Sequence, residues 1–378
     1  MDDKFNPFLV SGYKSAQYFC DRVTETARLK SHVQNGKNTT LFAIRRLGKT
    51  GLIHHLFQGY ARNNKVACIY LDILGTKNLS EFTNQLATAI YNRFPEQKGL
   101  GKKIIAAIQS LRPLISFDTL TGNPELSFEL NNVKSYERTI EQLFRFLDQQ
   151  RITVVFAIDE FQQILAYPEK NTEAILRTHI QSLKNTRFIF CGSNQQMMHE
   201  IFNDTKRPFF ASCMNMTLDF IDAKTYGEFI VGTFAREKRS IVPEAIDFIL
   251  SWTKQHTFYT QYVCNYLFAT NKKKIKLEDV QQAMVDILEQ NEHVYYQYKN
   301  LLTDAQWRFL MAIAKEEKLH NPHAKKFIGK YQLGTSSMVT RLLDALLTKD
   351  MIYLNAGVEQ PYYEVYDKFL MRWLQRKS

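Results

Sequence analysis

The hydrophobic positions of this chain first follow an alternation of short apolar runs and amphipathic segments. Runs such as KVACIYLDI (65–73) are apolar almost without interruption, which is typical of strands buried on both faces. Between the runs, apolar residues such as Leu52, Ile53 and Leu56 recur at helical spacing. This order predicts an α/β fold, a parallel sheet with helices on both faces. Strands are expected at 40–46, 65–73, 151–164, 187–194 and 214–221, and helices at 49–63, 79–94, 134–149 and 172–184.

Residues 98–131 break this alternation. The stretch ISFDTLTGNPELSFEL (115–130) contains the turn residues Gly122-Asn123-Pro124 between two alternating runs. Such a pattern predicts a β-hairpin, inserted into the sheet domain near 113–131.

The pattern changes again after residue 220. Helical segments follow one another without strands, and we expect them at 223–237, 243–253, 257–271 and 277–291. Further on come three helices, two short strands and a last helix, which is the order of a winged helix. These are expected at 303–317, 322–331, 335–348, 351–355, 362–366 and 367–376. The chain is therefore predicted to contain a P-loop-type sheet domain (1–220), a helical lid (221–292) and a winged helix (293–378).

Composition is compatible with this division. A length of 378 residues predicts two or three domains, and 45% hydrophobic residues can supply their cores. The formal net charge is +11, spread along the chain rather than concentrated in a tail. A basic surface of this kind fits nucleic acid or another anionic partner, and it equally fits a solvated surface rich in lysine.

The cysteines and the lengths of the apolar runs indicate the cellular compartment. The five cysteines include no C-x-x-C pair, which favours a reduced intracellular protein over a disulfide framework or a zinc ribbon. The first residues, MDDKFNPF, do not form an apolar signal region, and no apolar run is long enough to span a membrane. We therefore expect a cytoplasmic protein with no membrane partner.

The strand at 40–46 is followed by Gly48-Lys49-Thr50 at the start of a predicted helix. This resembles the end of the phosphate-binding loop G-x-x-x-x-G-K-[ST], or Walker A motif. Backbone N–H groups at a helix N-terminus bind phosphate, a lysine neutralises the β and γ phosphates, and a hydroxyl binds magnesium. We therefore predict an ATP site with Mg²⁺ whose loop comprises Ala43, Arg45, Arg46, Leu47, Gly48, Lys49, Thr50 and Gly51.

Ala43 occupies the place of the first glycine of that motif. If the position needs a positive φ, alanine is strained by about 1 kcal/mol. If its backbone is extended, alanine costs little. The departure therefore does not exclude the predicted site. The backbone conformation at Ala43 decides how much the missing glycine costs.

A second motif ends the apolar run VVFAIDE, at Asp159 and Glu160. An apolar strand that ends in two acids is a Walker B candidate, in which Asp159 orders the magnesium shell and Glu160 polarises the attacking water. The alternative is two solvated acids near the start of the next helix. A Walker A motif in the same α/β pattern favours the first interpretation.

Further polar residues are expected near the phosphates. Ser193 and Asn194 follow the next strand, where they would lie between the two Walker motifs, or would simply cap a helix. Arg207 is a candidate arginine finger, in cis or in trans. His54 and His55 lie on a predicted helix and are expected at its exposed face or in the protein core rather than as metal ligands. Thr50 and Asp159 therefore define the predicted metal site.

Together these parts resemble the archaeal-type ATPases of the AAA+/STAND group of P-loop NTPases, in a bacterial branch found in Bacteroidetes. The stretch Tyr18 to Val23 resembles the family's F-x-x-R-x-x-E-x-x-L lead-in, with Glu25 offset from the usual acid. Residues 335–339 and 366–369 resemble its winged-helix ending. The resemblance implies ATP hydrolysis with magnesium and a nucleotide-dependent change between the sheet domain and the lid.

Three departures from the family pattern are visible. Ala43 replaces a glycine, residues 255–259 lack the Gly-x-Pro of STAND relatives, and residues 209–212 lack an arginine that many relatives carry there. The last two bear on ring-type activation and on the arginine finger rather than on nucleotide binding.

The winged helix has two open interpretations. Residues 322–349 carry Lys325, Lys326, Lys330 and one arginine, Arg341, which fits weak or non-specific DNA contact. They equally fit a winged helix that contacts its own ATPase domain, a protein partner or another copy of the chain.

The leading hypothesis is an ATPase that acts as a nucleotide-driven switch, with Lys49, Glu160 and Arg207 as its catalytic residues. The alternative is a DNA-binding regulator that binds nucleotide without hydrolysing it.

Overall fold

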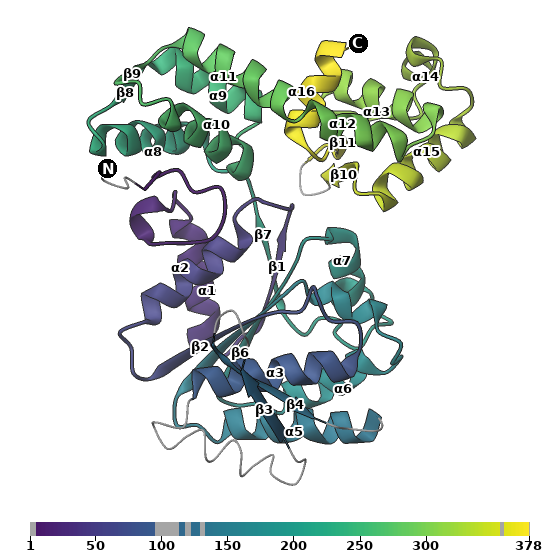
Figure 1. Ribbon diagram of the computed structural model, residues 1–378. Coiled ribbons are helices and arrows are strands. Elements are labelled where there is room, and N and C mark those ends of the chain that lie inside the picture. Colours follow the sequence, from purple (N-terminus) through teal and green to yellow (C-terminus); the bar gives the residue numbers. More distant parts are fainter. Residues whose placement is uncertain (1–4, 95–112, 118–121, 129–132, 356–358, 378) are drawn as a thin grey trace. The chain divides into compact units, whose positions relative to one another are not determined.

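The computed structural model describes residues 5–94, 113–117, 122–128, 133–355 and 359–377 (Figure 1). Its contacts divide into two compact units. One unit comprises residues 12–219, and the other joins residues up to Ser11 with the chain from Phe220 onward. The predicted boundaries at 220 and 292 stay predictions.

The first unit contains a five-stranded parallel sheet in the order β2-β5-β6-β1-β7. The predicted parallel sheet is therefore confirmed. Burial explains the apolar runs, because every residue of β1 and all but the first residue of β5 are buried. β6 lies between β1 and β5, which places its carboxyl end between theirs. The strands are β1 (Thr39–Ala43), β2 (Val66–Asp72), β5 (Thr153–Asp159), β6 (Thr186–Gly192) and β7 (Met214–Leu218).

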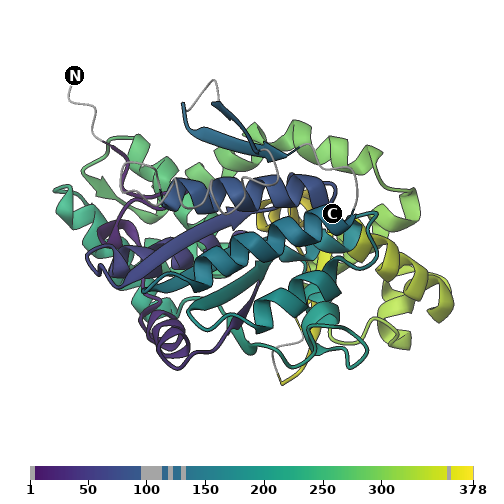
Figure 2. The same ribbon diagram turned by 90° about the horizontal axis from the view of Figure 1, so that it is seen from below.

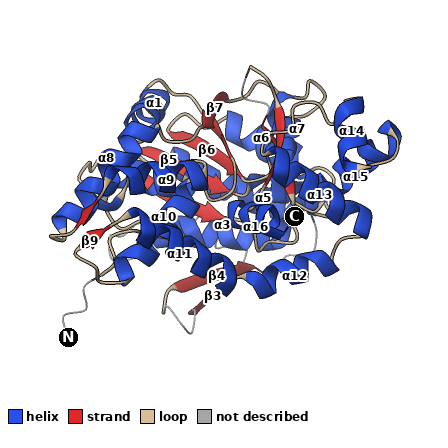
Figure 3. Cartoon of the chain, turned by 90° about the horizontal axis from the view of Figure 1, so that it is seen from above, coloured by secondary structure: helices blue, strands red, loops and turns tan. Residues whose placement is uncertain are grey.

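Helices cover both faces of this sheet (Figures 2 and 3). On one side lie α1 (Val23–Gln34) and α2 (Lys49–Tyr60), and on the other α3 (Leu79–Arg93), α5 (Val133–Asp148), α6 (Thr172–Gln181) and α7 (Gln195–Asn203). Two short 3₁₀ helices are η1 (Ala16–Tyr18) and η4 (Phe161–Ala166). Phenylalanine rings from β6, η4 and α7 form the centre of the core on the second side, among them Phe161, Phe190 and Phe202.

The predicted hairpin is present as β3 (Pro113–Phe117) and β4 (Pro124–Phe128), which pair antiparallel. β4 is attached to α3, because the Thr88 hydroxyl accepts a hydrogen bond from the Leu126 N–H at 2.9 Å. Residues 118–121 and 129–131 of the predicted insertion lie outside the described residues.

The second unit begins with a helical region that also contains two short strands. The prediction of helices without strands was wrong here, because β8 (Ser240–Ile241) and β9 (Lys274–Ile275) pair in parallel. Two residues per strand are too few to produce an apolar alternation. The helices are α8 (Ala223–Arg236), α9 (Pro243–Thr253), α10 (Thr257–Ala269) and α11 (Leu277–Gln290).

The rest of this unit has the predicted order of three helices, a hairpin and a last helix. The sequence prediction missed a further helix, α12 (Glu292–Asn300), whose surface is mostly polar or exposed. Gly357, expected in the hairpin turn, lies outside the described residues. The elements are α13 (Asp304–Glu316), α14 (Lys325–Tyr331), α15 (Ser336–Thr348), β10 (Ile352–Asn355), β11 (Tyr362–Val365) and α16 (Lys368–Lys377).

Helix α16, the last helix of the winged helix, packs against helices α9 and α10 of the helical region. The ring of Phe369 packs against Trp252 of α9 and Tyr259 of α10, with centroids 5.6 and 4.7 Å apart. Burial raises the pKa of Glu317, but the hydrogen bonds that it accepts from Lys254 and Arg372 outweigh burial and lower this pKa to about 2. The apolar contacts of α16 and the ion pair of Glu317 with Lys254 therefore both join the winged helix to α9 and α10.

A buried ion pair lies at the base of α16. The Lys368 Nζ is 2.8 Å from the Glu364 Oε1, and their side chains are 0% and 3% exposed. The Tyr353 hydroxyl donates to the Glu364 Oε2 at 2.6 Å, and Lys368 also donates to the Val365 carbonyl at 3.0 Å. Each charge is thus stabilised only as long as its partner is present.

We predict that Lys368→Met destabilises this unit by about 3–5 kcal/mol, because the Glu364 carboxylate stays buried without its cation. The double variant Lys368→Met with Glu364→Leu should recover most of that loss. Urea unfolding followed by tryptophan fluorescence measures this, since the three tryptophans, Trp252, Trp307 and Trp373, all belong to this unit. A single variant as stable as the wild type would contradict the prediction.

Candidate nucleotide-binding site

The predicted phosphate loop connects β1 to α2. Ala43 ends β1, Lys49 begins α2, and Gly48 precedes the helix with φ 100° and ψ 18°. Arg46 also has a positive φ, at 61°. The left-handed residues turn the chain sharply, so that the N-terminus of α2 follows directly on the carboxyl end of a buried strand.

Ala43 fits this loop without backbone strain. It is part of β1, pairs with Leu218 of β7, and does not have a left-handed φ. The glycine expected by the motif is therefore dispensable here, because the left-handed positions are Arg46 and Gly48.

Lys49 is buried between two carboxylates. Its Nζ lies 2.8 Å from the Asp159 Oδ1 and 3.1 Å from the Glu160 Oε1. Burial alone lowers the pKa of Lys49, but Asp159 and Glu160 outweigh burial and raise it. The lysine therefore stays charged in a position where an unpaired cation would be costly.

Asp159 connects three elements. Its Oδ2 accepts hydrogen bonds from the Thr50 hydroxyl at 2.9 Å and from the Tyr70 hydroxyl of β2 at 2.8 Å. Burial and the neighbouring Asp159 both raise the pKa of Tyr70. Tyr70 was not among the predicted site residues, because only the register between β2 and β5 brings it next to Asp159.

Glu160 is held by neighbours on both sides. Its Oε2 accepts from the Gln162 Nε2 at 2.6 Å, the Ser193 Oγ at 2.7 Å and the Ser193 N–H at 3.2 Å. Burial raises the pKa of Glu160, but Lys49 and these hydrogen bonds outweigh burial and lower it. Arg45 in turn donates to the Ser193 Oγ at 3.3 Å. Ser193 thus lies between the two motifs, at the position that the strand order gives it.

The predicted loop residues Leu47 and Gly51 contact the stretch before α1. The Leu47 carbonyl accepts a hydrogen bond from the buried Arg22 guanidinium at 3.4 Å, and Arg22 also pairs with Glu25 at 2.8 Å. A Cβ on Gly51 would come within 3.2 Å of the Phe19 ring. Phe19 and Arg22 of the lead-in therefore lie against the phosphate loop and the start of α2, and Glu25 pairs with Arg22.

The predicted site residues Asn194 and Arg207 have partners outside this group. The Asn194 side chain caps α7 by accepting from the Met197 N–H at 3.0 Å. Arg207 pairs with Glu173 of α6 at 2.9 Å and with Glu200 of α7 at 3.2 Å. A role for Arg207 as an arginine finger stays a prediction.

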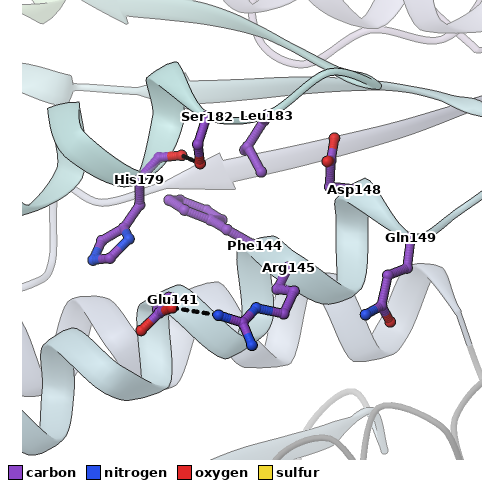
Figure 4. Close-up of a pocket in the computed structure, with 8 residues that line it drawn as sticks. All are labelled: Glu141, Phe144, Arg145, Asp148, Gln149, His179, Ser182 and Leu183. Atoms are coloured by element: carbon purple, nitrogen blue, oxygen red, sulfur yellow. Dashed lines mark hydrogen bonds and ion pairs between the residues drawn. The ribbon is translucent and has the colours of Figure 1, made fainter.

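A separate cavity of about 270 Å³ lies between α5 and α6 (Figure 4). Two pairs in its lining bind each other, Arg145 with Glu141 and the Ser182 hydroxyl with the His179 carbonyl. Asp148 and Ser182 precede β5 and β6, so the cavity lies toward the amino ends of the strands. It is therefore distinct from the Lys49 group, which lies at the carboxyl ends.

A parallel sheet with a phosphate loop after β1 and two acids at the end of β5 defines a P-loop NTPase fold. Residues 19–256 match the family described as an ATPase domain predominantly from Archaea. The chain therefore belongs to this family of ATPase domains. Residues 293–376 match a probable winged helix domain, which confirms the predicted C-terminal winged helix.

Solved structures share this architecture along the whole chain. The Walker-type ATPase of Pyrococcus abyssi has a TM-score of 0.67 and 16% identity, with 98% of this chain and 99% of that chain covered. The ORC2 protein of Aeropyrum pernix, solved in ADPNP and ADP complexes, has a TM-score of 0.59 and 12% identity, with coverage of 100% and 98%. The ORC1 protein of the same organism, solved with DNA, has a TM-score of 0.50 and 13% identity, with coverage of 95% and 93%.

No curated protein matches this chain. In the part of the chain that the structure describes, no helix has the length and apolar character needed to cross a membrane.

We predict opposite results for two substitutions in the loop. Ala43→Gly should leave the ATP dissociation constant within about two-fold, since Ala43 already has an unstrained extended backbone. Gly48→Ala places a Cβ on a left-handed residue, a cost of about 1–2 kcal/mol that the free loop of the variant should avoid by leaving this conformation. Binding then has to restore the conformation and should weaken by about 5- to 30-fold. Equilibrium titration with a fluorescent ATP analogue checks both. Tighter binding by Ala43→Gly than by Gly48→Ala is expected, and the reverse order would refute this account of the loop.

Proposed function

We propose that the chain binds Mg-ATP on the loop 43–51 and hydrolyses it to ADP and phosphate, as a nucleotide-driven switch with a winged-helix effector domain. The observation that carries this proposal is the contact group of Lys49, Thr50, Asp159, Glu160 and Ser193 at the carboxyl ends of three adjacent strands. Membership of the ATPase family supports it.

In this proposal Lys49 exchanges partners. It leaves the carboxylates of Asp159 and Glu160 and pairs with the β and γ phosphates, while the N–H groups at the start of α2 bind phosphate oxygens. Since Lys49 is already charged and buried, much of its desolvation cost is met before ATP arrives.

The oxygen atoms of Thr50 and Asp159 are hard donors, and their 2.9 Å contact places both at the edge of the loop. They fit Mg²⁺, which in such sites takes one or two protein ligands together with phosphate oxygens and water. Bound there, the ion would neutralise phosphate charge. Glu160 would orient the attacking water and accept its proton.

The sheet offers a route from the loop to the second unit. Ala43, where the loop begins, pairs with Leu218, and Leu218 lies two residues before Phe220, where the second unit begins. A shift of the loop would therefore displace the end of β7 and the chain that connects the units. This connection supports a nucleotide-dependent change between the two units, and its use as a switch is part of the proposal.

We expect Glu160→Gln to reduce ATP turnover by about 10²- to 10⁴-fold while ATP binding is retained, because the amide cannot accept the water's proton. Lys49→Ala is the control and should lose binding itself. Phosphate release and equilibrium ATP binding separate the two variants. Wild-type protein that binds ATP without turnover, with or without DNA, would favour the non-hydrolysing alternative.

We also propose duplex DNA as a partner of the winged helix. Helix α16 packs against α9 of the helical region. The polar residues at the start of α15 are exposed: Thr335, Ser336, Ser337, Thr340 and Arg341. Lys325 and Lys326 on α14 are exposed as well, whereas Lys330 pairs with Glu316 at 2.7 Å. Within this unit the polar face of α15 is therefore exposed, as a helix that enters a groove requires. The structural similarity to an ORC1 protein solved with DNA also supports this.

Lys325→Glu with Lys326→Glu should weaken DNA binding and reduce the slope of log K against log salt by about two, one for each lost phosphate contact. Lys184→Glu with Lys206→Glu makes the same charge change at exposed positions of the other unit and should have little effect. Fluorescence anisotropy of a labelled duplex across a salt series measures both. Absence of binding by the wild type at low salt would remove DNA as a partner and leave a protein partner or self-association.

A further inference from the structure

The two oxygens of Glu160 have different partners. Oε1 pairs with Lys49, whereas Oε2 accepts the hydrogen bonds from Gln162 and Ser193. If Lys49 moves to the phosphates, Glu160 loses its cation and keeps the donors on Oε2. The orientation of the carboxylate in the nucleotide-bound site would then depend on Gln162 and Ser193.

The backbone at Glu160 has an unusual conformation of its own. Glu160 has φ 55° and ψ 40°, a left-handed conformation that is unusual for a residue with a side chain. It connects the end of β5 to η4, and its carbonyl accepts from the Gln163 N–H at 2.9 Å. Residues in such conformations persist when their surroundings fix them, and they concentrate at functional sites.

Gln162 is itself fixed in place by its packing. It lies on η4 and is 7% exposed, and its hydrogen bond to Glu160 is the shortest of the three on Oε2. Its Oε1 lies against Gly192, where an added Cβ would be only 2.2 Å away. Gly192 does not have a positive φ, so lack of space and not backbone strain opposes a side chain there.

From these contacts we propose that Gln162 is a positioning residue for Glu160, and that Gly192 is required because it leaves room for the Gln162 amide. This inference rests on the proposed ATPase function. Gln162 donates to the oxygen that Lys49 does not use, so it holds the carboxylate in one orientation while the lysine changes partners. Gly192 thus supplies the space, and the adjacent Ser193 supplies the other two donors.

The adjacent Gln163 provides a matched control. It is the same residue type on the same 3₁₀ helix, but its Nε2 donates to the Thr76 carbonyl at 2.8 Å and not to Glu160. Replacing either glutamine by leucine removes one amide donor from η4. Only the change at residue 162 removes a donor from Glu160.

Gln162→Leu should lower kcat for ATP hydrolysis by about 10- to 100-fold and leave KM within about two-fold, because a displaced base affects the chemical step and not ATP binding. Gln163→Leu should leave both constants within about two-fold. Phosphate release at a series of ATP concentrations gives both constants. Wild-type kcat in Gln162→Leu, or equal losses in the two variants, would overturn the inference.

A double-mutant cycle with Gly192→Ala tests the second half of the proposal. The added methyl group would also meet Met198 at 2.6 Å, so this variant is expected to lower the melting temperature as well as kcat. In a Gln162→Ala background the fall in kcat from Gly192→Ala should disappear, while the fall in melting temperature through Met198 remains. Fold losses in kcat that multiply in the double variant would overturn the role assigned to Gly192.

These outcomes separate the inference from the proposed function. Turnover by the wild type and by Gln163→Leu, together with unchanged kcat in Gln162→Leu, would refute the role of Gln162 alone. A wild type without turnover would refute hydrolysis, and the positioning role with it.

Discussion

The ion group of Lys49 with Asp159 and Glu160 is the interaction on which the candidate site depends. A buried cation is tolerated only where anions compensate its desolvation. Here both anions are supplied by the end of β5, within 3.1 Å of the lysine. The charges that stabilise Lys49 in this structure are thus the same groups that the proposed reaction needs for magnesium and for water. A triphosphate can replace the two carboxylates as the partner of Lys49 without leaving a charge unpaired.

The strand order determines which side chains meet at this group. Parallel strands direct their carboxyl ends to one edge, and β6 lies between β1 and β5. Ser193 therefore reaches Glu160, and Tyr70 on β2 reaches Asp159 from the other side. On the far side of β1, β7 leads directly into the second unit, so the residues that would contact phosphate and the chain that connects the units share one sheet.

The sequence alone was sufficient for the features that depend on local pattern. The apolar runs identified the parallel sheet, and Gly48-Lys49-Thr50 and Asp159-Glu160 identified the residues that the fold brings together. Gln162 and Tyr70 were not predictable in this way, because their roles depend on contacts across η4 and between strands. The backbone at Ala43 also needed the structure, since a sequence cannot show whether a missing glycine had a left-handed φ. β8, β9 and α12 were missed because short or polar elements leave a weak periodic signal.

A crystal structure of the chain with Mg²⁺ and a non-hydrolysable ATP analogue tests the central claim most directly. The account predicts the analogue on the loop 43–51, Lys49 hydrogen-bonded to its β and γ phosphate oxygens, and Glu160 still bound by Gln162 and Ser193. A structure in which Lys49 keeps both carboxylates while the analogue binds elsewhere, or not at all, would contradict it.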